Sequence, residues 1–220
     1  MYPARPPHLY NNEREVAHLT LHKTFTSYHH ARDQAYKDAL VQMGEQHEIF
    51  LDQSVDTGDI PEDLDDQTIR QKIRDDYLRD STVTIVLVGQ ETKKRKHVDW
   101  EIYSSMFDGQ VNKKSGILVV NLPATGCDRC TAVHDGEKEN VYPDISNWTT
   151  ISSRAEYEQR YPHMPDRIID NLLKSRARIS VVPWAKICNP DILRFLIEAT
   201  FQDRQHCDYD LSRPMRRANS

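Results

Sequence analysis

Hydrophobic and polar positions along the chain predict a regular series of strands and helices. The clearest strand is 82–88 (TVTIVLV), which is apolar almost throughout, as is typical of a central parallel strand covered on both faces. Other apolar positions recur at the helical spacing of three to four residues. The predicted strands are 22–28, 48–51, 82–88 and 116–121, and the predicted helices are 32–45, 66–79 and 97–107.

This order of elements determines the expected fold class. Strands that alternate with helices favour a parallel sheet with helices on both faces, so we predict an α/β, flavodoxin-like open sheet. Residues 179–182 are a candidate fifth strand. Asn189 and Pro190 are typical of the N-cap and first position of a last helix, which we expect to continue to about Phe201.

A length of 220 residues suits one domain with a real core. We predict a proline-rich arm over 1–19, a domain over 20–205 and a tail over 206–220. Within the domain, 123–178 is a long insertion before the last strand. Because a structureless loop of that length is unusual in a compact domain, we expect short helices at 154–160 and 165–175.

Composition narrows the functional classes. Hydrophobic residues make up 38% and charged residues 29%, and the formal net charge is −5. That charge gives no support for a nucleic-acid partner held by phosphate contacts. The chain has no apolar run of membrane-spanning length, and its first residues lack the apolar core of a signal peptide. We therefore expect a cytoplasmic protein with neither membrane nor nucleic acid as a partner.

Ligands of open parallel sheets bind at the carboxyl ends of the strands. The loops after these ends carry neither G-x-G-x-x-G nor G-x-x-x-x-G-K-[ST], so a Rossmann dinucleotide site and a P-loop are unsupported. A receiver domain would need acidic residues at the end of its first strand, where this chain has Ser27, Tyr28 and His29. The three commonest functions of this fold are thus rejected.

Two stretches carry a family resemblance. FTSYHHARD (25–33) resembles the opening of TIR domains, and VTIVLVGQET with KHVDWEI (83–92 and 96–102) resembles their third strand and the following helix, where the catalytic Glu of the family lies. The combination is most similar to the TIR-like proteins of bacterial Thoeris anti-phage systems, over about 20–121. This resemblance implies that Glu101 is the catalytic residue.

The resemblance also implies an activity and partners. Such domains cleave the nicotinamide–ribose bond of NAD⁺, which is a substrate here, so no cofactor is expected. In Thoeris systems the product is a cyclic or conjugated ADP-ribose signal that activates an effector protein. A phage component as trigger and a homo-oligomer are further expected partners. A non-enzymatic adaptor and a nucleotide-sensing module remain alternatives.

The position of Glu101 suits this chemistry. Val98, Ile102 and Met106 form an apolar stripe on the third helix, and Glu101 lies just beside it. Nicotinamide leaves as a neutral molecule from a cationic precursor, so no general acid is needed to protonate it. Ordinary glycosidases use two carboxylates, but here one is sufficient, and it stabilises the oxocarbenium-like transition state. The alternative is an ordinary exposed glutamate.

The substrate-binding residues are predicted from strand ends and from the resemblance. A hydroxyl and an aromatic ring at the end of the first strand suit a ribose and a base, although strand-end packing explains them about as well. Many TIR enzymes have Trp four residues before the catalytic Glu, where this chain has His97. The predicted set is Phe25, Ser27, Tyr28, His29, Asp56, His97, Trp100 and Asn121. Turn chemistry and strand capping are the alternatives for Asp56 and Asn121.

Cys127 and Cys130 form a CxxC motif with His134 nearby. A structural zinc site would need further well-spaced ligands, and the chain has no second CxxC. We therefore predict no metal site.

Overall fold

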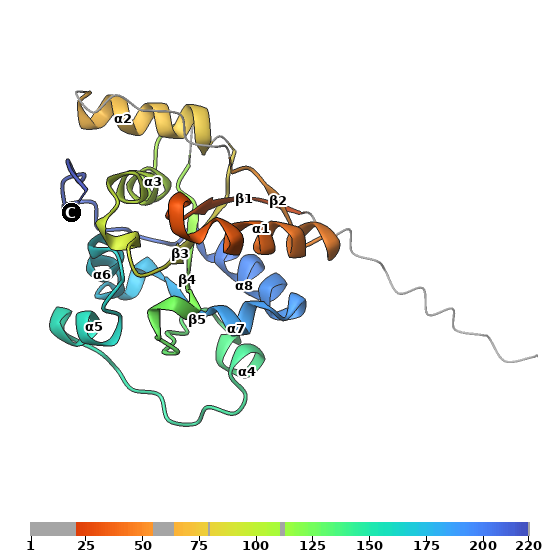
Figure 1. Ribbon diagram of the computed structural model, residues 1–220. Helices are drawn as coiled ribbons and strands as arrows, with labels where there is room; N and C mark the ends of the chain where they lie inside the picture. The colour runs from red at the N-terminus through yellow and green to blue at the C-terminus, as the bar shows by residue number, and fades with distance from the viewer. Residues whose placement is uncertain (1–20, 55–63, 79, 111–112, 220) are drawn as a thin grey trace, which may run out of the picture.

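A computed structural model describes residues 21–54, 64–78, 80–110 and 113–219 of the chain. Its centre is a five-stranded, all-parallel sheet in the order β2-β1-β3-β4-β5 (Figure 1). The strands are β1 His22–Ser27, β2 Phe50–Asp52, β3 Val83–Val88, β4 Gly116–Asn121 and β5 Ser180–Pro183. The predicted flavodoxin-like α/β fold is confirmed.

The helices alternate with these strands. They are α1 His30–Gln46, α2 Asp66–Lys72, α3 Lys96–Met106, α4 Glu137–Val141, α5 Arg154–Arg160, α6 Asp166–Leu172, α7 Trp184–Ile187 and α8 Pro190–Asp203. The helix predicted over 66–79 is α2 followed by π-helical turns, Ile73–Tyr77. The helix predicted over 165–175 is α6 followed by a 3-10 turn, Ser175–Ala177. The short helices α4 and α7 were not predicted.

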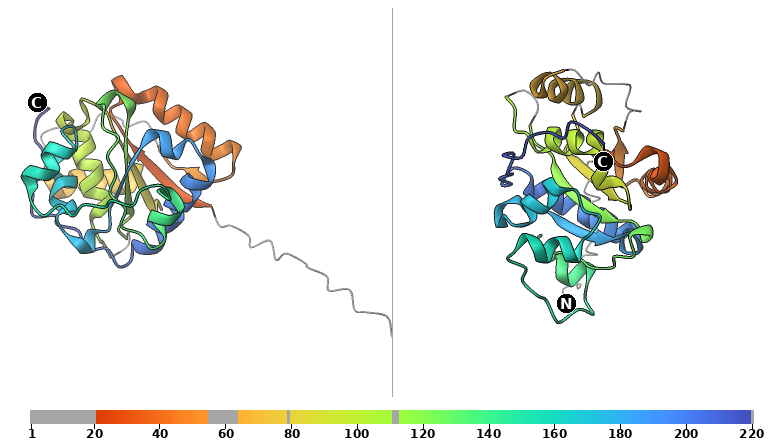
Figure 2. Two further views of the ribbon diagram at one scale, coloured as in Figure 1. Left: turned by 90° about the horizontal axis from the view of Figure 1, so that it is seen from below. Right: turned by 60° about the vertical axis from the view of Figure 1, so that its left-hand side comes forward.

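Helices cover both faces of the sheet (Figure 2). On one face, α1 and α8 pack on side chains such as Ile85, Leu87 and Leu118. On the other face, α3 and α6 pack on Val86, Val88 and similar residues. Neighbouring residues of β3 face opposite ways and all six are buried, which explains why the strand is a continuous apolar run.

The strand order fixes where a ligand site is expected. The chain goes from β1 outward to β2 and then returns to the other side of β1 as β3. Connections therefore leave in opposite directions at β1 and β3, and the crevice at the carboxyl ends of these strands is the usual ligand site of such sheets. Ser27, the last residue of β1, pairs with Val86 of β3 at this edge.

The segment after α8, residues 204–219, packs on the sheet face that carries α3 and α6. It contains no further long helix, but Cys207 and Met215 are buried. Met215 joins a core cluster with Phe25, Ile73 and Trp100. The predicted tail thus contributes to the core.

Among the described residues, no helix combines the length and the apolar character needed to cross a bilayer.

Gly116 allows β4 and α8 to approach closely. A Cβ at this position would lie 2.4 Å from the carbonyl oxygen of Thr200 and 2.7 Å from its Cγ2. We expect Gly116→Ala to lower the free energy of unfolding by about 1–3 kcal/mol, measured by urea denaturation. Thr200→Ser removes Cγ2 but leaves the carbonyl, so it should not rescue Gly116→Ala; a full rescue would contradict this explanation.

Candidate functional site

A buried hydrogen bond joins the end of β1 to α3. The hydroxyl of Ser27 donates to Oε2 of Glu101 at 2.6 Å, and both residues are almost completely buried, with Glu101 only 2% exposed. Ser27 lies on the same face of β1 as Phe25, which is the face that α3 covers. Glu101 is in the second turn of α3, between the buried residues Trp100 and Ile102. Residues 74 positions apart are thereby held together.

Burial changes the acidity of this carboxyl group. Loss of water around Glu101 raises its pKa to about 8, although the hydrogen bond from Ser27 acts in the opposite direction. A carboxyl group that titrates near neutrality inside a fold is a recognised sign of a functional site. Asp99, two residues earlier on α3, has a different environment. Its carboxylate accepts hydrogen bonds from the guanidinium of Arg167 and from the backbone N–H of Arg216.

A hollow of about 340 Å³ lies beside this pair. Its lining comes from the end of β1, the start of α1 and the start of α3, and includes Tyr28, His29, Arg95, His97 and Asn219. The carboxyl group of Glu101 is not part of this lining, since it lies one turn further along α3. The hollow and the carboxyl group are adjacent but separated in this conformation.

Unpartnered polar atoms lie near the same edge of the sheet. Nδ1 of His29, Oδ2 of Asp33 and Nε of Arg95 are buried and form no hydrogen bond within the part of the chain that the structure describes. Such atoms are costly unless a ligand or water completes them. Burial and the nearby cations Arg95 and Arg32 lower the pKa of His29.

Asp33 approaches the backbone just beyond β3. Burial raises the pKa of its carboxyl group, and a Cβ on Gly89 would lie only 2.5 Å from its Oδ2. Gly89 is therefore needed for the approach of Asp33. These features give this edge of the sheet two buried carboxyl groups, Glu101 and Asp33.

The structure brings only some of the predicted site residues together. Ser27 contacts Glu101, and Tyr28, His29 and His97 line the hollow. The rings of Tyr28 and His30 stack with their centroids 4.3 Å apart.

The other predicted residues lie elsewhere. Phe25 and Trp100 belong to the core cluster with Met215, and the indole N–H of Trp100 donates to the carbonyl of Arg216 at 2.7 Å. Asn121 is buried at the end of β4, where its amide contacts the sulfur of Cys127. Asp56 lies outside the described residues.

Two further residues line the hollow. Arg95 belongs to the basic run 93–96 before α3, which on the sequence alone suits either the pyrophosphate of NAD⁺ or a solvated surface. Asn219 was not predicted: it comes from the segment after α8, where its Oδ1 accepts a hydrogen bond from the Lys96 N–H at the start of α3, and it reaches the hollow only through folding. Asp33 was not predicted either, although Gly89 gave a sequence signal for it. A glycine directly after a buried strand indicates that another group approaches the backbone closely.

The cysteines of the CxxC motif serve other contacts. The thiol of Cys127 donates to the carbonyl of Arg160, and His134 contacts Asp203 and Thr200. No group of three or more His, Cys, Asp or Glu side chains suited to a metal ion occurs in the described part of the chain.

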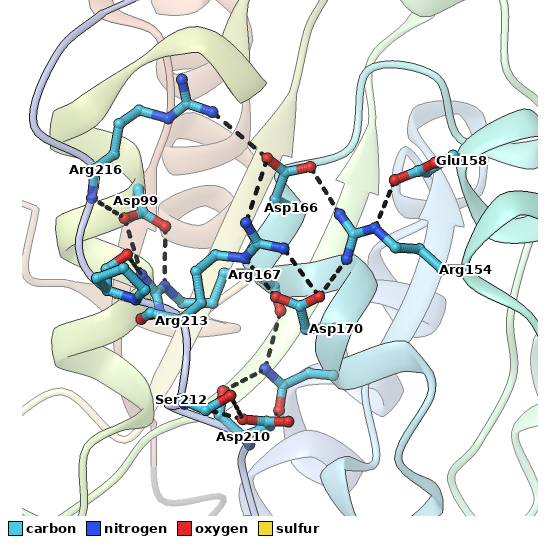
Figure 3. Close-up of polar contacts among 12 residues, drawn as sticks. Asp99, Arg154, Glu158, Asp166, Arg167, Asp170, Asp210, Ser212, Arg213 and Arg216 are labelled. Carbon is cyan, nitrogen blue, oxygen red and sulfur yellow. Dashed lines mark hydrogen bonds and ion pairs between the residues drawn. The ribbon is translucent and has the colours of Figure 1, made fainter.

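A polar network fixes α3 from outside the strand–helix core (Figure 3). Arg167 of α6, which is fully buried, forms two hydrogen bonds with Asp99 at 2.9 and 3.0 Å. It also donates to the carbonyls of Arg213 and Pro214. The insertion and the segment after α8 therefore meet at the helix that carries Glu101.

Comparison with known proteins identifies the class. Residues 25–126 match the family model described as "Thoeris protein ThsB, TIR-like domain", a range that extends from β1 to the turn after β4. This part of the chain is a TIR-like domain. More particularly, it belongs to the family of the Thoeris protein ThsB. A search of curated proteins found no match.

The pKa of Glu101 makes stability depend on pH. The unfolded state releases the proton near the ordinary value of 4.5, whereas the folded state keeps it until about 8. The free energy of unfolding should therefore fall as pH rises through this window, by on the order of 1 kcal/mol per pH unit. Glu101→Gln imitates the protonated form, so its stability gain over wild type should grow from pH 5 to pH 8.

Thermal or urea unfolding at several pH values measures this difference. Glu139→Gln is the matched control because Glu139 is exposed, and its effect should not change with pH. A constant difference between wild type and Glu101→Gln from pH 5 to pH 8 would show that the carboxyl group titrates normally.

Arg167→Met tests the network. It leaves Asp99 buried without its cation, so we expect a loss of about 3–5 kcal/mol in the free energy of unfolding. Arg213→Met is the control, because the Arg213 side chain is 36% exposed where it pairs with Asp170, and we expect it to cost about 1 kcal/mol or less. Equal effects in urea denaturation would exclude a special role for Arg167.

Proposed function

We propose that this protein is an NAD⁺-cleaving enzyme of anti-phage defence, in which Glu101 is the catalytic carboxylate. The single observation that carries the proposal is the buried Ser27–Glu101 pair at the carboxyl edge of a ThsB-type TIR-like domain. Bond cleavage would release nicotinamide and leave an ADP-ribosyl cation for an acceptor. With an acceptor inside the same molecule, the product is a cyclic ADP-ribose species, and with another acceptor it is a conjugate.

The residues of the site suit separate roles in this reaction. The ionised carboxylate of Glu101 would stabilise positive charge on the ribose ring in the transition state. The hydroxyl of Ser27 orients that carboxylate. The rings of Tyr28 and His97 and the guanidinium of Arg95 line the adjacent hollow, where they suit an aromatic base and a pyrophosphate.

Access to Glu101 is part of the proposal. Because the carboxyl group is shielded and its pKa is raised to about 8, the described conformation corresponds to a resting state. Movement of the α3 start, where His97 and Val98 separate Glu101 from the hollow, would admit substrate and ionise the carboxyl group together. A phage component is the proposed trigger, and an effector protein that responds to the product is the proposed downstream partner.

A second candidate is a nucleotide-binding module without turnover. The observation that favours it is the same shielding of Glu101. In that case the hollow would bind a nucleotide and signal through α3, and Glu101 would contribute only to packing.

The two functions differ in the fate of NAD⁺. We expect infected cells that express the wild type to lose NAD⁺ and to accumulate nicotinamide with a new ADP-ribose species, measured by mass spectrometry. Glu101→Gln keeps the shape and the hydrogen bond from Ser27 but cannot carry negative charge, so its turnover should fall by at least about 100-fold.

Controls separate chemistry from folding. Glu139→Gln should behave as wild type, and circular dichroism should show that Glu101→Gln is folded. Full turnover by Glu101→Gln would refute the assignment of the catalytic residue. Unchanged NAD⁺ in infected cells with the wild type would favour the binding module.

A further inference from the structure

A second hollow lies within the insertion, apart from the one beside Glu101. It has a volume of about 520 Å³ and is lined by side chains between positions 128 and 160. All of this lining follows residue 126, where the family match ends. The chain between α4 and α5, which forms much of the lining, runs as an extended loop (Figure 1). The two hollows share no lining residue.

The charge of this hollow is positive. Arg129, Lys138 and Arg160 line it, against one acidic residue, Asp128. None of the three cations forms an ion pair among the residues that the structure describes; Arg160 instead donates to the hydroxyl of Thr149 at 2.8 Å. In a chain with a formal net charge of −5, three unneutralised cations around one cavity point to an anionic ligand.

An aromatic ring is fixed in the same hollow. The indole N–H of Trp148 donates to the carbonyl of Ile145 at 3.1 Å, and the ring meets Tyr142 edge-on with centroids 5.5 Å apart. The ammonium of Lys138 lies 4.8 Å from the centroid of the Trp148 ring. A half-buried, oriented indole next to cations provides a stacking surface for a flat ring.

Tyr142 also contributes an unpartnered polar atom behind this lining. The residue is buried, and within the described chain its hydroxyl oxygen has no hydrogen-bond partner of normal geometry. The thiol of Cys130, which lines the hollow, interacts with this hydroxyl group. A polar ligand atom near Cys130 would complete this hydroxyl group.

We propose that this hollow, defined by Arg129, Lys138, Trp148 and Arg160, is a binding site for a nucleotide. The cations receive the phosphate, and Trp148 receives the base. The volume lies in the usual range for small-molecule sites, and the site lies along the outer edge of β5, where Thr131 pairs with Val181. The proposal does not depend on the catalytic role of Glu101.

Calorimetric titration of the full chain with AMP tests the charge requirement. We expect the double variant Arg129→Ala/Arg160→Ala to bind AMP at least about tenfold more weakly than wild type. Arg176→Ala is the matched control, since it removes the same charge from an exposed residue outside the hollow, and it should not change the affinity.

Titration with ribose 5-phosphate and with inorganic phosphate tests the ring requirement. We expect both to bind at least about tenfold more weakly than AMP, and Trp148→Phe to retain more of the AMP affinity than Trp148→Ala. Circular dichroism and thermal unfolding verify that each variant is folded. The proposal is overturned if wild type does not bind AMP, if the double variant binds it normally, if Arg176→Ala weakens binding as much as the double variant does, or if ribose 5-phosphate binds equally well.

Discussion

The hydrogen bond from Ser27 to Glu101 ties the edge of the sheet to the helix that covers it, in surroundings from which water is excluded. Glu101 lies between Trp100, which packs in one core cluster, and Ile102, which packs in another. The carboxyl group therefore cannot turn toward solvent unless α3 itself shifts. The position, the raised pKa and the shielding of Glu101 all follow from this constraint.

The two carboxylates of α3 show how the fold separates structural from reactive groups. Asp99 accepts hydrogen bonds from a buried guanidinium and a backbone N–H, so its charge is compensated by fixed partners. Within the part of the chain that the structure describes, Glu101 accepts one hydrogen bond, from the neutral hydroxyl of Ser27. A carboxylate with so little compensation gains from a cationic partner, and a substrate that develops positive charge supplies one.

Much of this architecture could be predicted from the sequence, because the spacing of apolar residues along a strand or helix indicates which of its faces is buried. The apolar run of β3 and the stripe formed by Val98, Ile102 and Met106 were sufficient to place the sheet, α3 and Glu101 beside the core. The site was harder, since the side of a strand that a residue faces depends on tertiary packing. Phe25 and Trp100 were predicted as substrate-binding residues, but both lie in the core cluster with Met215.

The contacts that the insertion and the segment after α8 make with α3 could not be predicted from the sequence. Arg167 meets Asp99 across 68 positions, and Asn219 meets Lys96 across 123. An arginine within a short helix and an asparagine near the end of this sequence look like ordinary surface residues. Their importance depends on how the insertion and the segment after α8 fold back on α3, which no local pattern encodes.

The network around Arg167 has a consequence for where the folded unit of this chain begins and ends. The segment that matches the family, 25–126, does not include Arg167, Met215 or Arg216, yet these residues cover and hold the helix that bears Glu101. Excised alone, that segment would present Trp100 and the rest of this face of α3 to water. The folded unit of this chain is therefore larger than the segment that matches the family, and a chimera that exchanges residues 25–126 must also carry the residues that cover α3.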